Sequence, residues 1–465
     1  MNRQYKYLIK NMGILTLSSF SSKILVFLII PLYTAVLTTE EYGFYDLMIS
    51  TAQFLSPVLT LNIADAVMRF SMDREISQAD VVSIGLRYVI RSFFGVLLFL
   101  IICRRVGIPR LLTGFEGLLW LYFVSSVSGQ FLIQCAKGME RVKDMGIAGI
   151  CGTVVMVSGN LVFLLVCHWG LRGFFLANIL AQAVPAGYLA VRLRVWRYIR
   201  RIQNAPLRGE MLRYSVPLIV TVIGWQVNGA ADKYVVSFLC GISANGLLSV
   251  SYKIPAVMNT LQNIFTQAWQ ISAVKEYDSQ DAGAFYGRMF QFTTAWLGLS
   301  CAGIILLCRP LARLLFAGEF YDAWRYVPFL VISSVINAAS GFLGPILSAA
   351  KNSAVMAKSA LYGSLANIVM NLALVYGYGV QGAAVATAIS SFIIYWVRIR
   401  AVRERIQGVD YRTVYLSWLL LCVQAGFEIV TGIYGMEVMI LALLGFVNRE
   451  VFIGIVRKGI GIVRR

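Results

Sequence analysis

Charged residues are scarce in this sequence of 465 residues, since Asp, Glu, Lys and Arg together make up only 14% of it. Soluble domains carry about 25% charged residues. Hydrophobic residues make up 58% of the chain, and its mean hydropathy is +0.73. A soluble core cannot hide that much apolar surface. The composition therefore excludes an ordinary soluble protein and predicts an integral membrane protein.

Residues that carry common catalytic and metal chemistry are also few. His168 is the only histidine, which argues against a histidine-based mechanism. The eight cysteines show no Cys-x-x-Cys or other metal-ligand spacing. We expect most of them, for example Cys103 and Cys301, to lie within apolar segments as small hydrophobic residues. The sequence thus predicts no catalytic residues, no metal site and no cofactor.

Long apolar runs are what the chain has in abundance. A helix needs about 20 apolar residues to cross about 30 Å of hydrocarbon, and on that basis we place about fourteen spans. The loops between them are short, so the fold class is an all-α polytopic membrane protein. The predicted spans begin near Asn11, Gly43, Ile84, Leu118, Ile147, Gly173, Ser215, Gly246, Phe290, Val327, Ser359, Gly382, Val414 and Met436.

The net charge of +19 does not indicate a nucleic-acid partner, because of where the charges lie. With a cytoplasmic N-terminus, about thirty of the 41 Lys and Arg fall in the termini and the even-numbered loops. This pattern predicts a multi-pass protein of the cell membrane with both termini in the cytoplasm. The clusters at Arg192 to Arg213 and Arg398 to Arg412 are expected to orient the chain and to contact anionic lipid headgroups.

A duplicated phrase organises the chain. Asn160 to Ala177 and Asn371 to Ala386, about 210 residues apart, each join two apolar segments through a Gly-x-x-Gly turn. Asn62 to Asp73 corresponds in the same way to Asn263 to Asp278. Repeated multi-helix units are typical of secondary transporters, which hold their substrate between the halves.

The repeat predicts two lobes of six spans and an added pair. We assign residues 1–195 to the N-terminal lobe, 196–211 to a basic cytoplasmic linker and 212–402 to the C-terminal lobe. Residues 403–465 contain spans thirteen and fourteen and a tail at the membrane surface. Because each lobe has an even number of spans, both insert with the same orientation, and a central cavity is expected between them.

Prolines fall inside several predicted spans. They are Pro31, Pro217, Pro255 and the Gly344-Pro345 pair. Each removes or weakens a backbone hydrogen bond where lipid offers no replacement. These positions are candidate hinges, although proline is in any case more frequent in membrane helices.

Eight ionisable residues fall inside predicted spans. Each would cost about 2.5 to 3.5 kcal/mol at the centre of a membrane helix, so each should face a wet cavity or a partner. Lys23 is the strongest candidate, because it lies about twelve residues into its span, too deep to reach a headgroup. The eight are Lys23, Asp65, Arg69, Arg91, Asp232, Lys233, Lys253 and Glu428.

From this set we predict Lys23, Arg69, Lys233 and Lys253 as substrate-binding residues. Asp65 and Asp232 are predicted as their charge partners or as ion-coupling residues. Asp65 and Arg69 lie four apart on one helix face and could instead neutralise each other, whereas Asp232 and Lys233 point about 100 degrees apart.

Two members of the set receive no place in that prediction. Arg91 is expected to reach the cytoplasmic surface, and the role of Glu428 is undefined. Because the deep cations outnumber the anions, the cavity should attract an anion, and phosphate or pyrophosphate on a membrane lipid is the natural candidate.

The chain resembles the polysaccharide flippase branch of the multidrug/oligosaccharidyl-lipid/polysaccharide exporter superfamily. The resemblance rests on the opening SSFSSKILVFLIIPLYTAVLTTEEYGFYDL, on DKYVVSFLCGISANGLLSVSYKI in the second half and on the two glycine turns. It implies two six-helix bundles in a V shape, with extra C-terminal helices in some members. Members are bacterial proteins that move undecaprenyl-pyrophosphate-linked sugars outward. Lys23 is similar in position to a basic residue in the first helix of peptidoglycan-precursor flippases.

The predicted function is therefore a flippase for polyprenyl-pyrophosphate-linked glycans in the bacterial cytoplasmic membrane, working by alternating access, with H+ or Na+ coupling left open. Two alternatives stay. A drug antiporter of the same superfamily would use carboxylates such as Asp65 and Asp232 to bind cations. A glycan polymerase or ligase would need a longer outer loop than Arg309 to Arg325.

Overall fold

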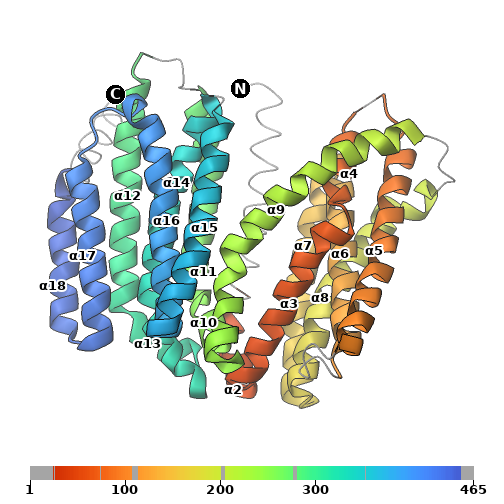
Figure 1. The fold of residues 1–465 in the computed structure, drawn as a ribbon, viewed down its shortest axis with the longest axis horizontal. Helices are drawn as coiled ribbons and strands as arrows, with labels where there is room; N and C mark the ends of the chain where they lie inside the picture. Colours follow the sequence, from red (N-terminus) through yellow and green to blue (C-terminus); the bar gives the residue numbers. More distant parts are fainter. Residues whose placement is uncertain are drawn as a thin grey trace. The chain divides into compact units, whose positions relative to one another are not determined.

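The structure is a computed structural model that describes residues 25, 27–73, 75–106, 114–199, 205–275, 280–350 and 352–451. These residues form helices joined by short loops (Figure 1). The predicted all-α polytopic fold is confirmed. The helices are α2 (Ile30–Val36), α3 (Thr39–Leu59), α4 (Ile63–Ser71), α5 (Gln78–Val106), α6 (Glu116–Gly138), α7 (Val142–Asn160), η2 (Leu161–Val166), α8 (Gly170–Leu193), η3 (Val195–Tyr198), α9 (Ala205–Cys240), α10 (Ile242–Ser251), α11 (Lys253–Lys275), α12 (Ala282–Leu306), α13 (Cys308–Leu315), η4 (Gly318–Tyr326), α14 (Val327–Ala349), α15 (Ser353–Tyr378), α16 (Val380–Val402), η5 (Arg403–Arg405), α17 (Tyr411–Val430) and α18 (Tyr434–Val447).

The described helices include 9 that are long and apolar enough to cross a membrane, or up to 10 if the bent pair α3 and α4 is one span. Every predicted span start from Gly43 onward falls inside a helix. The first start, near Asn11, lies outside the described residues, so the total of about fourteen stays a prediction. Three further predicted spans correspond to helices that are not among these 9 or 10. They are α9, the α10–α11 segment and the shorter α18.

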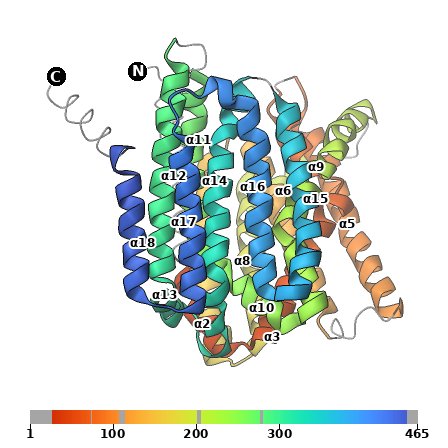
Figure 2. The same ribbon diagram turned by 60° about the vertical axis from the view of Figure 1, so that its left-hand side comes forward.

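The chain divides into two compact units, Met1–Val227 and Asn228–Arg465. The division falls inside α9, which contributes its first part to one unit and its last part to the other. Within the second unit, α17 and α18 pack against each other and against α12 (Figure 2). The lobe and linker boundaries expected at residues 195, 211 and 402 stay a prediction.

In the first unit, α6 is the central helix and contacts α3, α4, α5 and α8. Its side chains Phe123 and Phe131 are almost completely buried. Aromatic rings gather near the start of α3, where the Tyr33 and Tyr42 rings stack with their centroids 5.1 Å apart. The Tyr45 ring packs edge-on against Phe174 of α8. The tyrosines of the YGFY phrase therefore form part of the packing of this unit.

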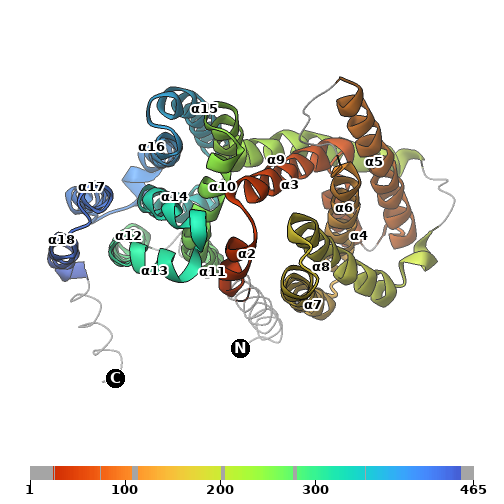
Figure 3. The same cartoon turned by 90° about the horizontal axis from the view of Figure 1, so that it is seen from below.

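In the second unit, α14 is the central helix. It contacts α11, α12, α16 and α17, and in Figure 3 these helices surround it. The indole of Trp269 stacks on Phe342 of α14 with ring centroids 4.2 Å apart. Its Nε1 donates a hydrogen bond of 2.9 Å to the Phe342 carbonyl oxygen. This bond satisfies the polar atom of a large buried side chain.

The two glycine turns found in the sequence have the same backbone design in both units. Gly170 and Gly379 have positive φ angles of 51° and 59°, a conformation that glycine adopts without steric cost. Gly173 and Gly382 lie against the preceding helix, where a Cβ would come within 2.9 Å of Phe163 and 2.1 Å of Leu374 respectively. Each turn thus reverses the chain and lets two helices pack closely, α7 with α8 and α15 with α16.

Each unit also contains an early broken helix. The axes of α3 and α4 differ by 58°, and the break contains Leu61 and Asn62 with positive φ angles. In the second unit the helix is interrupted at Tyr252, between α10 and α11, and Pro255 lies in the first turn of α11. Pro217 and Pro345 lie inside α9 and α14, which continue past them. Only Pro255 among these three prolines therefore accompanies a break.

Candidate functional site

The residue predicted with the strongest argument, Lys23, lies outside the described residues. The other predicted site residues fall into two groups, one in each unit. Asp65 and Arg69 belong to α4 in the first unit. Asp232, Lys233 and Lys253 belong to α9 and α11 in the second unit.

Asp65 is held by neutral amides. The Nδ2 atom of Asn62 donates to its Oδ2 over 2.8 Å, and the Nε2 atom of Gln134 on α6 donates to its Oδ1 over 2.6 Å. Arg69 is exposed, and within the described part of the chain it forms no ion pair with Asp65. The mutual neutralisation considered from their spacing is therefore not what the structure shows. Arg69 lies on an exposed face of α4.

A polar cavity of about 80 Å³ lies beside the α3–α4 break in the first unit. Its polar lining consists of amides and hydroxyls from several helices. One amide oxygen, Oε1 of Gln226, is buried and has no hydrogen-bond partner among the described residues. A cavity of this size and polarity can hold a few water molecules but not a sugar ring. Its polar lining residues are Gln53, Ser56, Thr60, Asn62, Ser126, Gln130 and Gln226.

Asp232 is completely buried in the second unit. The hydroxyl of Tyr252 donates a hydrogen bond to its Oδ2, and the backbone N–H of Lys233 donates to its Oδ1 over 3.1 Å. Tyr252 is the residue at the break between α10 and α11, and Lys253 follows it directly. The structure therefore brings Asp232 to this break. The side chains of Lys233 and Lys253 are half-buried.

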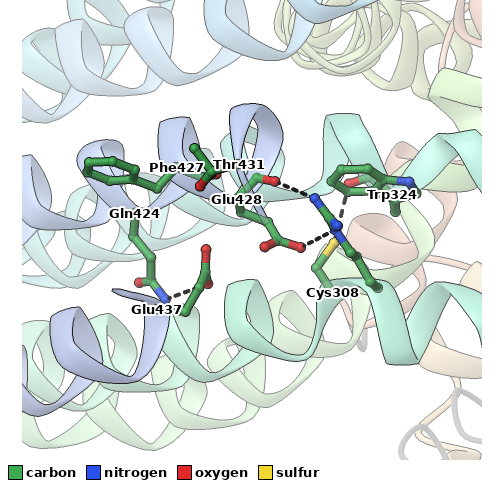
Figure 4. Close-up of polar contacts among 8 residues, drawn as sticks. Cys308, Trp324, Gln424, Phe427, Glu428, Thr431 and Glu437 are labelled. Atoms are coloured by element: carbon green, nitrogen blue, oxygen red, sulfur yellow. Dashed lines mark hydrogen bonds and ion pairs between the residues drawn. The ribbon is translucent and has the colours of Figure 1, made fainter. Parts of the chain in front are cut away.

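A third polar group was only partly visible in the sequence. Glu428 of α17 forms an ion pair with Arg309 of α13, with 2.9 Å between Nε and Oε1 (Figure 4). The same guanidinium donates from Nη2 to the Glu428 carbonyl oxygen over 2.8 Å and lies 4.3 Å above the ring of Trp324. Glu437 of α18 is also buried and accepts a 3.2 Å hydrogen bond from Nε2 of Gln424. Glu428, undefined from the sequence, thus has a partner.

Sequence reasoning missed this group because its members lie at the ends of predicted segments. Arg309 follows the end of α12 and resembles a loop residue, and Glu437 lies in the first turn of α18. In the sequence, Glu428 alone indicated that a buried polar group exists here, because a carboxylate inside a span requires a partner.

Arg398 and Arg91 were both expected at the cytoplasmic surface of the membrane, and both contact neighbouring residues of the protein. Arg398, counted among the cytoplasmic cluster, is buried, and its guanidinium donates to Oγ of Ser359 and to the Ser340 carbonyl oxygen. It therefore joins α16 to α15 and α14, and the expectation that it contacts lipid headgroups is wrong for this residue. Arg91 is exposed and lies over the Tyr88 ring at 5.3 Å.

Two curated relatives resemble this chain over much of its length. An uncharacterized membrane protein of Methanocaldococcus jannaschii is 21% identical over 406 residues, which cover 83% of this chain and 95% of the relative. The probable low-salt glycan biosynthesis flippase Agl15 of Haloferax volcanii is 22% identical over 307 residues, which cover 63% of this chain and 62% of the relative.

Solved structures share the fold. The lipid II flippase MurJ in an inward closed conformation matches with a TM-score of 0.69 and 14% identity, covering 94% of this chain and 98% of that one. An inward-facing multidrug resistance transporter of the MATE family matches with a TM-score of 0.63 and 14% identity, covering 82% and 94%. At such identities these matches establish the fold alone.

The comparison with protein families gives information about function as well as fold. The family model described as polysaccharide biosynthesis protein matches residues 8–270, which is more than half of the chain. This range contains the predicted site residues, among them Lys23, Arg69 and Lys253. Together with the apolar helices and the transporter fold, it supports a membrane flippase or transporter. The chain belongs to the polysaccharide biosynthesis protein family of multi-pass membrane proteins.

Proposed function

We propose that this protein is a flippase that carries undecaprenyl-pyrophosphate-linked oligosaccharides across the bacterial cytoplasmic membrane for surface polysaccharide biosynthesis. The observation that carries the proposal is the family match over residues 8–270, since that family serves polysaccharide biosynthesis. The transporter fold and the relative named as a probable glycan biosynthesis flippase support it. A lipid-linked saccharide is the polysaccharide intermediate that a membrane transporter would move.

The pyrophosphate is the part of this substrate that positively charged side chains of the protein would bind. Lys23, Arg69, Lys233 and Lys253 are proposed to attract it, because cations between low-dielectric walls attract anions strongly. Support comes from the exposed position of Arg69 on α4 and from the half-buried positions of Lys233 and Lys253 beside the α10–α11 break. The polyprenyl tail would stay in the bilayer, because exposing its apolar surface to water is unfavourable.

Alternating access requires places where helices can change direction. The α3–α4 break and the α10–α11 break supply one in each unit. An anionic headgroup moving outward is driven by an inside-negative potential, by about 2.3 kcal/mol per charge for each 100 mV. Membrane potential could therefore contribute to transport, and coupling to H+ or Na+ through Asp65 or Asp232 would add to it.

The test is surface polysaccharide production by cells that depend on this protein. Replacing Lys23 by alanine should lower production by about tenfold to a hundredfold, because one hydrogen bond to a charged group contributes about 1.5 to 3 kcal/mol. Lys23→Arg should retain most activity, since the charge is kept. Lys137→Ala, at an exposed position near the end of α6, is the matched control and should have no effect.

The membrane level of each variant is measured alongside, so that loss of protein is separated from loss of transport. Full polysaccharide production by Lys23→Ala at normal protein level would contradict the assigned role of Lys23.

A cation-coupled drug antiporter is the second candidate. The observation in its favour is the carboxylate of Asp232, buried in the second unit and hydrogen-bonded to Tyr252, because such a group could bind a cation. Fold similarity to the MATE transporter is compatible with it. Uptake of a cationic dye by vesicles under an imposed proton or sodium gradient distinguishes the two: the flippase proposal predicts no uptake above that of empty vesicles. Uptake that Asp232→Asn abolishes would favour the antiporter.

A further inference from the structure

The buried group around Glu428 lies where α17 ends and α18 begins. Glu428 is two residues from the end of α17, and Glu437 is in the first turn of α18. Their side chains point toward each other in Figure 4, and the carboxylate of Glu428 also pairs with Arg309. Both glutamates are 1% exposed, and Gln424, which contacts Glu437, is completely buried. Two acidic side chains therefore share one enclosed space.

The charges in this space do not balance. Two ionised carboxylates and one guanidinium leave one negative charge uncompensated. Arg309 is already committed to Glu428, through the 2.9 Å ion pair and the bond to its backbone carbonyl. A buried charge without compensation costs several kcal/mol. Two carboxyl groups that lie within hydrogen-bonding reach of each other cannot both be ionised cheaply.

The surroundings of Glu437 leave room for a proton. Gln424 donates from Nε2 to Oε2 of Glu437 and to the Ala302 carbonyl oxygen. Oε1 of Glu437 and Oε1 of Gln424 are both buried and accept no hydrogen bond from any residue that the structure describes. The Oε1 atom of Glu428 faces Nε of Arg309 at ion-pair distance, without the alignment of a hydrogen bond. A proton on the carboxyl pair would satisfy one of these oxygens.

Among the described residues, the other titratable groups on the neighbouring helices do not supply the missing charge. Cys308 of α13 donates its thiol to the Trp324 carbonyl oxygen. Cys301 of α12 is a buried thiol. Arg325 of η4 lies over the Trp324 ring and forms its ion pair with Asp322, and both of these side chains are more than half exposed. The sequence of α14, which also packs on α17, contains no titratable side chain.

We propose that Glu428 and Glu437 form a proton-binding site of the second unit, in which the two carboxyl groups share one proton and Arg309 compensates the remaining charge. Coupled acids of this kind bind and release the proton as a pair. Loss of the proton would place a new negative charge against Glu428. Because Arg309 also stacks on Trp324, that change would reach η4 and α13 as well as the α17–α18 turn.

Proton occupancy is measured by infrared difference spectroscopy on the purified full-length protein in lipid. A protonated carboxyl group gives a carbonyl stretching band that carboxylates do not. At about pH 7 exposed carboxyl groups are ionised. Because Asp232 is also completely buried, the reference protein carries Asp232→Asn, and it should retain one such band. The band should disappear in Glu437→Gln and in Glu428→Gln, which keep the side-chain shape. Glu404→Gln, at an exposed position, is the matched control and should leave the band unchanged.

Arg309→Gln separates a proton site from a structural contact. Without the guanidinium both carboxyl groups should be protonated, so the band should about double in area. A merely structural ion pair predicts no such increase. The proposal is overturned if the Asp232→Asn reference protein has no protonated carboxyl band at about pH 7, or if its band survives both glutamine substitutions. It is also overturned if sodium removes the band at constant pH, because the occupant would then be a metal cation. No lipid-linked sugar is needed, so the outcome is independent of the proposed function.

Discussion

Gly432 illustrates how one residue can decide whether an ion pair forms. Its φ angle is +61°, and a Cβ at this position would lie 2.1 Å from Nη2 of Arg309. The absence of a side chain therefore lets the turn between α17 and α18 approach the guanidinium that holds Glu428.

Replacing Gly432 by alanine should destabilise the protein by about 1 to 2 kcal/mol, because a left-handed conformation is strained for any residue with a Cβ. The new methyl group should also displace Arg309 from Glu428. Thermal unfolding of the purified protein measures the effect. Gly426→Ala, inside α17 with open space around it, is the control and should be neutral or slightly stabilising. Equal melting temperatures for the Gly432 variant and the wild type would refute the packing argument.

Asp410 caps the N-terminus of α17 from outside the span. Its carboxylate accepts hydrogen bonds from the Thr413 hydroxyl and from the backbone N–H groups of Arg412 and Thr413. The bond from the Thr413 hydroxyl is the main reason that the pKa of Asp410 lies below its usual value. The stabilisation is therefore complete above the unfolded pKa of about 3.9 and is lost as the pH falls through the lower folded pKa.

Asp410→Ala should cost about 1 kcal/mol at neutral pH, the typical value of a helix cap. Asp410→Asn should retain most of the stability and lose the dependence on pH that this group contributes. Melting temperatures measured from neutral to acidic pH test both statements. An alanine variant as stable as the wild type at neutral pH would show that the cap contributes nothing.

Sequence reasoning identified charged residues inside spans but not the partners of all of them. Spacing along one helix suggested that Asp65 pairs with Arg69, yet amides of Asn62 and of Gln134 on another helix hold it. Arg309 and Glu428 are likewise brought together only by packing between helices. A single sequence records distances along a helix, whereas these partners depend on how separate helices pack.

At the scale of the helices, the glycine turns were the feature that the sequence predicted best. Their conformation is local, since a positive φ and a close approach both demand glycine. The α3–α4 break was not predicted, because Leu61 and Asn62 adopt positive φ angles without a glycine. Helix spans were predictable because lipid imposes a length and a hydrophobicity on them.

The turn between α15 and α16 provides a test of the glycine argument. A Cβ on Gly382 would lie 2.1 Å from the Leu374 carbonyl oxygen, a backbone atom that cannot rotate away. Gly382→Ala should therefore destabilise the second unit by about 1 to 3 kcal/mol, as overpacking does. Gly377→Ala, in the same helix pair with open space around it, should not destabilise it. Thermal unfolding distinguishes the two variants, and a Gly382 variant as stable as the Gly377 variant would contradict the close packing.

At the scale of the whole molecule, the distribution of basic residues predicts the orientation in the membrane. With the eight native cysteines replaced, Glu404→Cys before α17 should react with a membrane-impermeant maleimide only from the cytoplasmic side. Ile433→Cys, at the turn between α17 and α18, should react only from the outside. Both positions are exposed. Labelling of both from the same side would show that α17 does not cross the membrane.

The most direct test of the proposed function is translocation of lipid-linked sugar by the purified protein in vesicles. The substrate is an undecaprenyl-pyrophosphate-linked oligosaccharide, and its appearance in the outer leaflet is measured with a membrane-impermeant glycosidase. We predict that the protein makes the sugar accessible, faster with an inside-negative potential, and that Lys23→Ala slows this by about tenfold or more. Sugar that becomes accessible no faster than in protein-free vesicles, while a cationic drug is transported, would contradict the account.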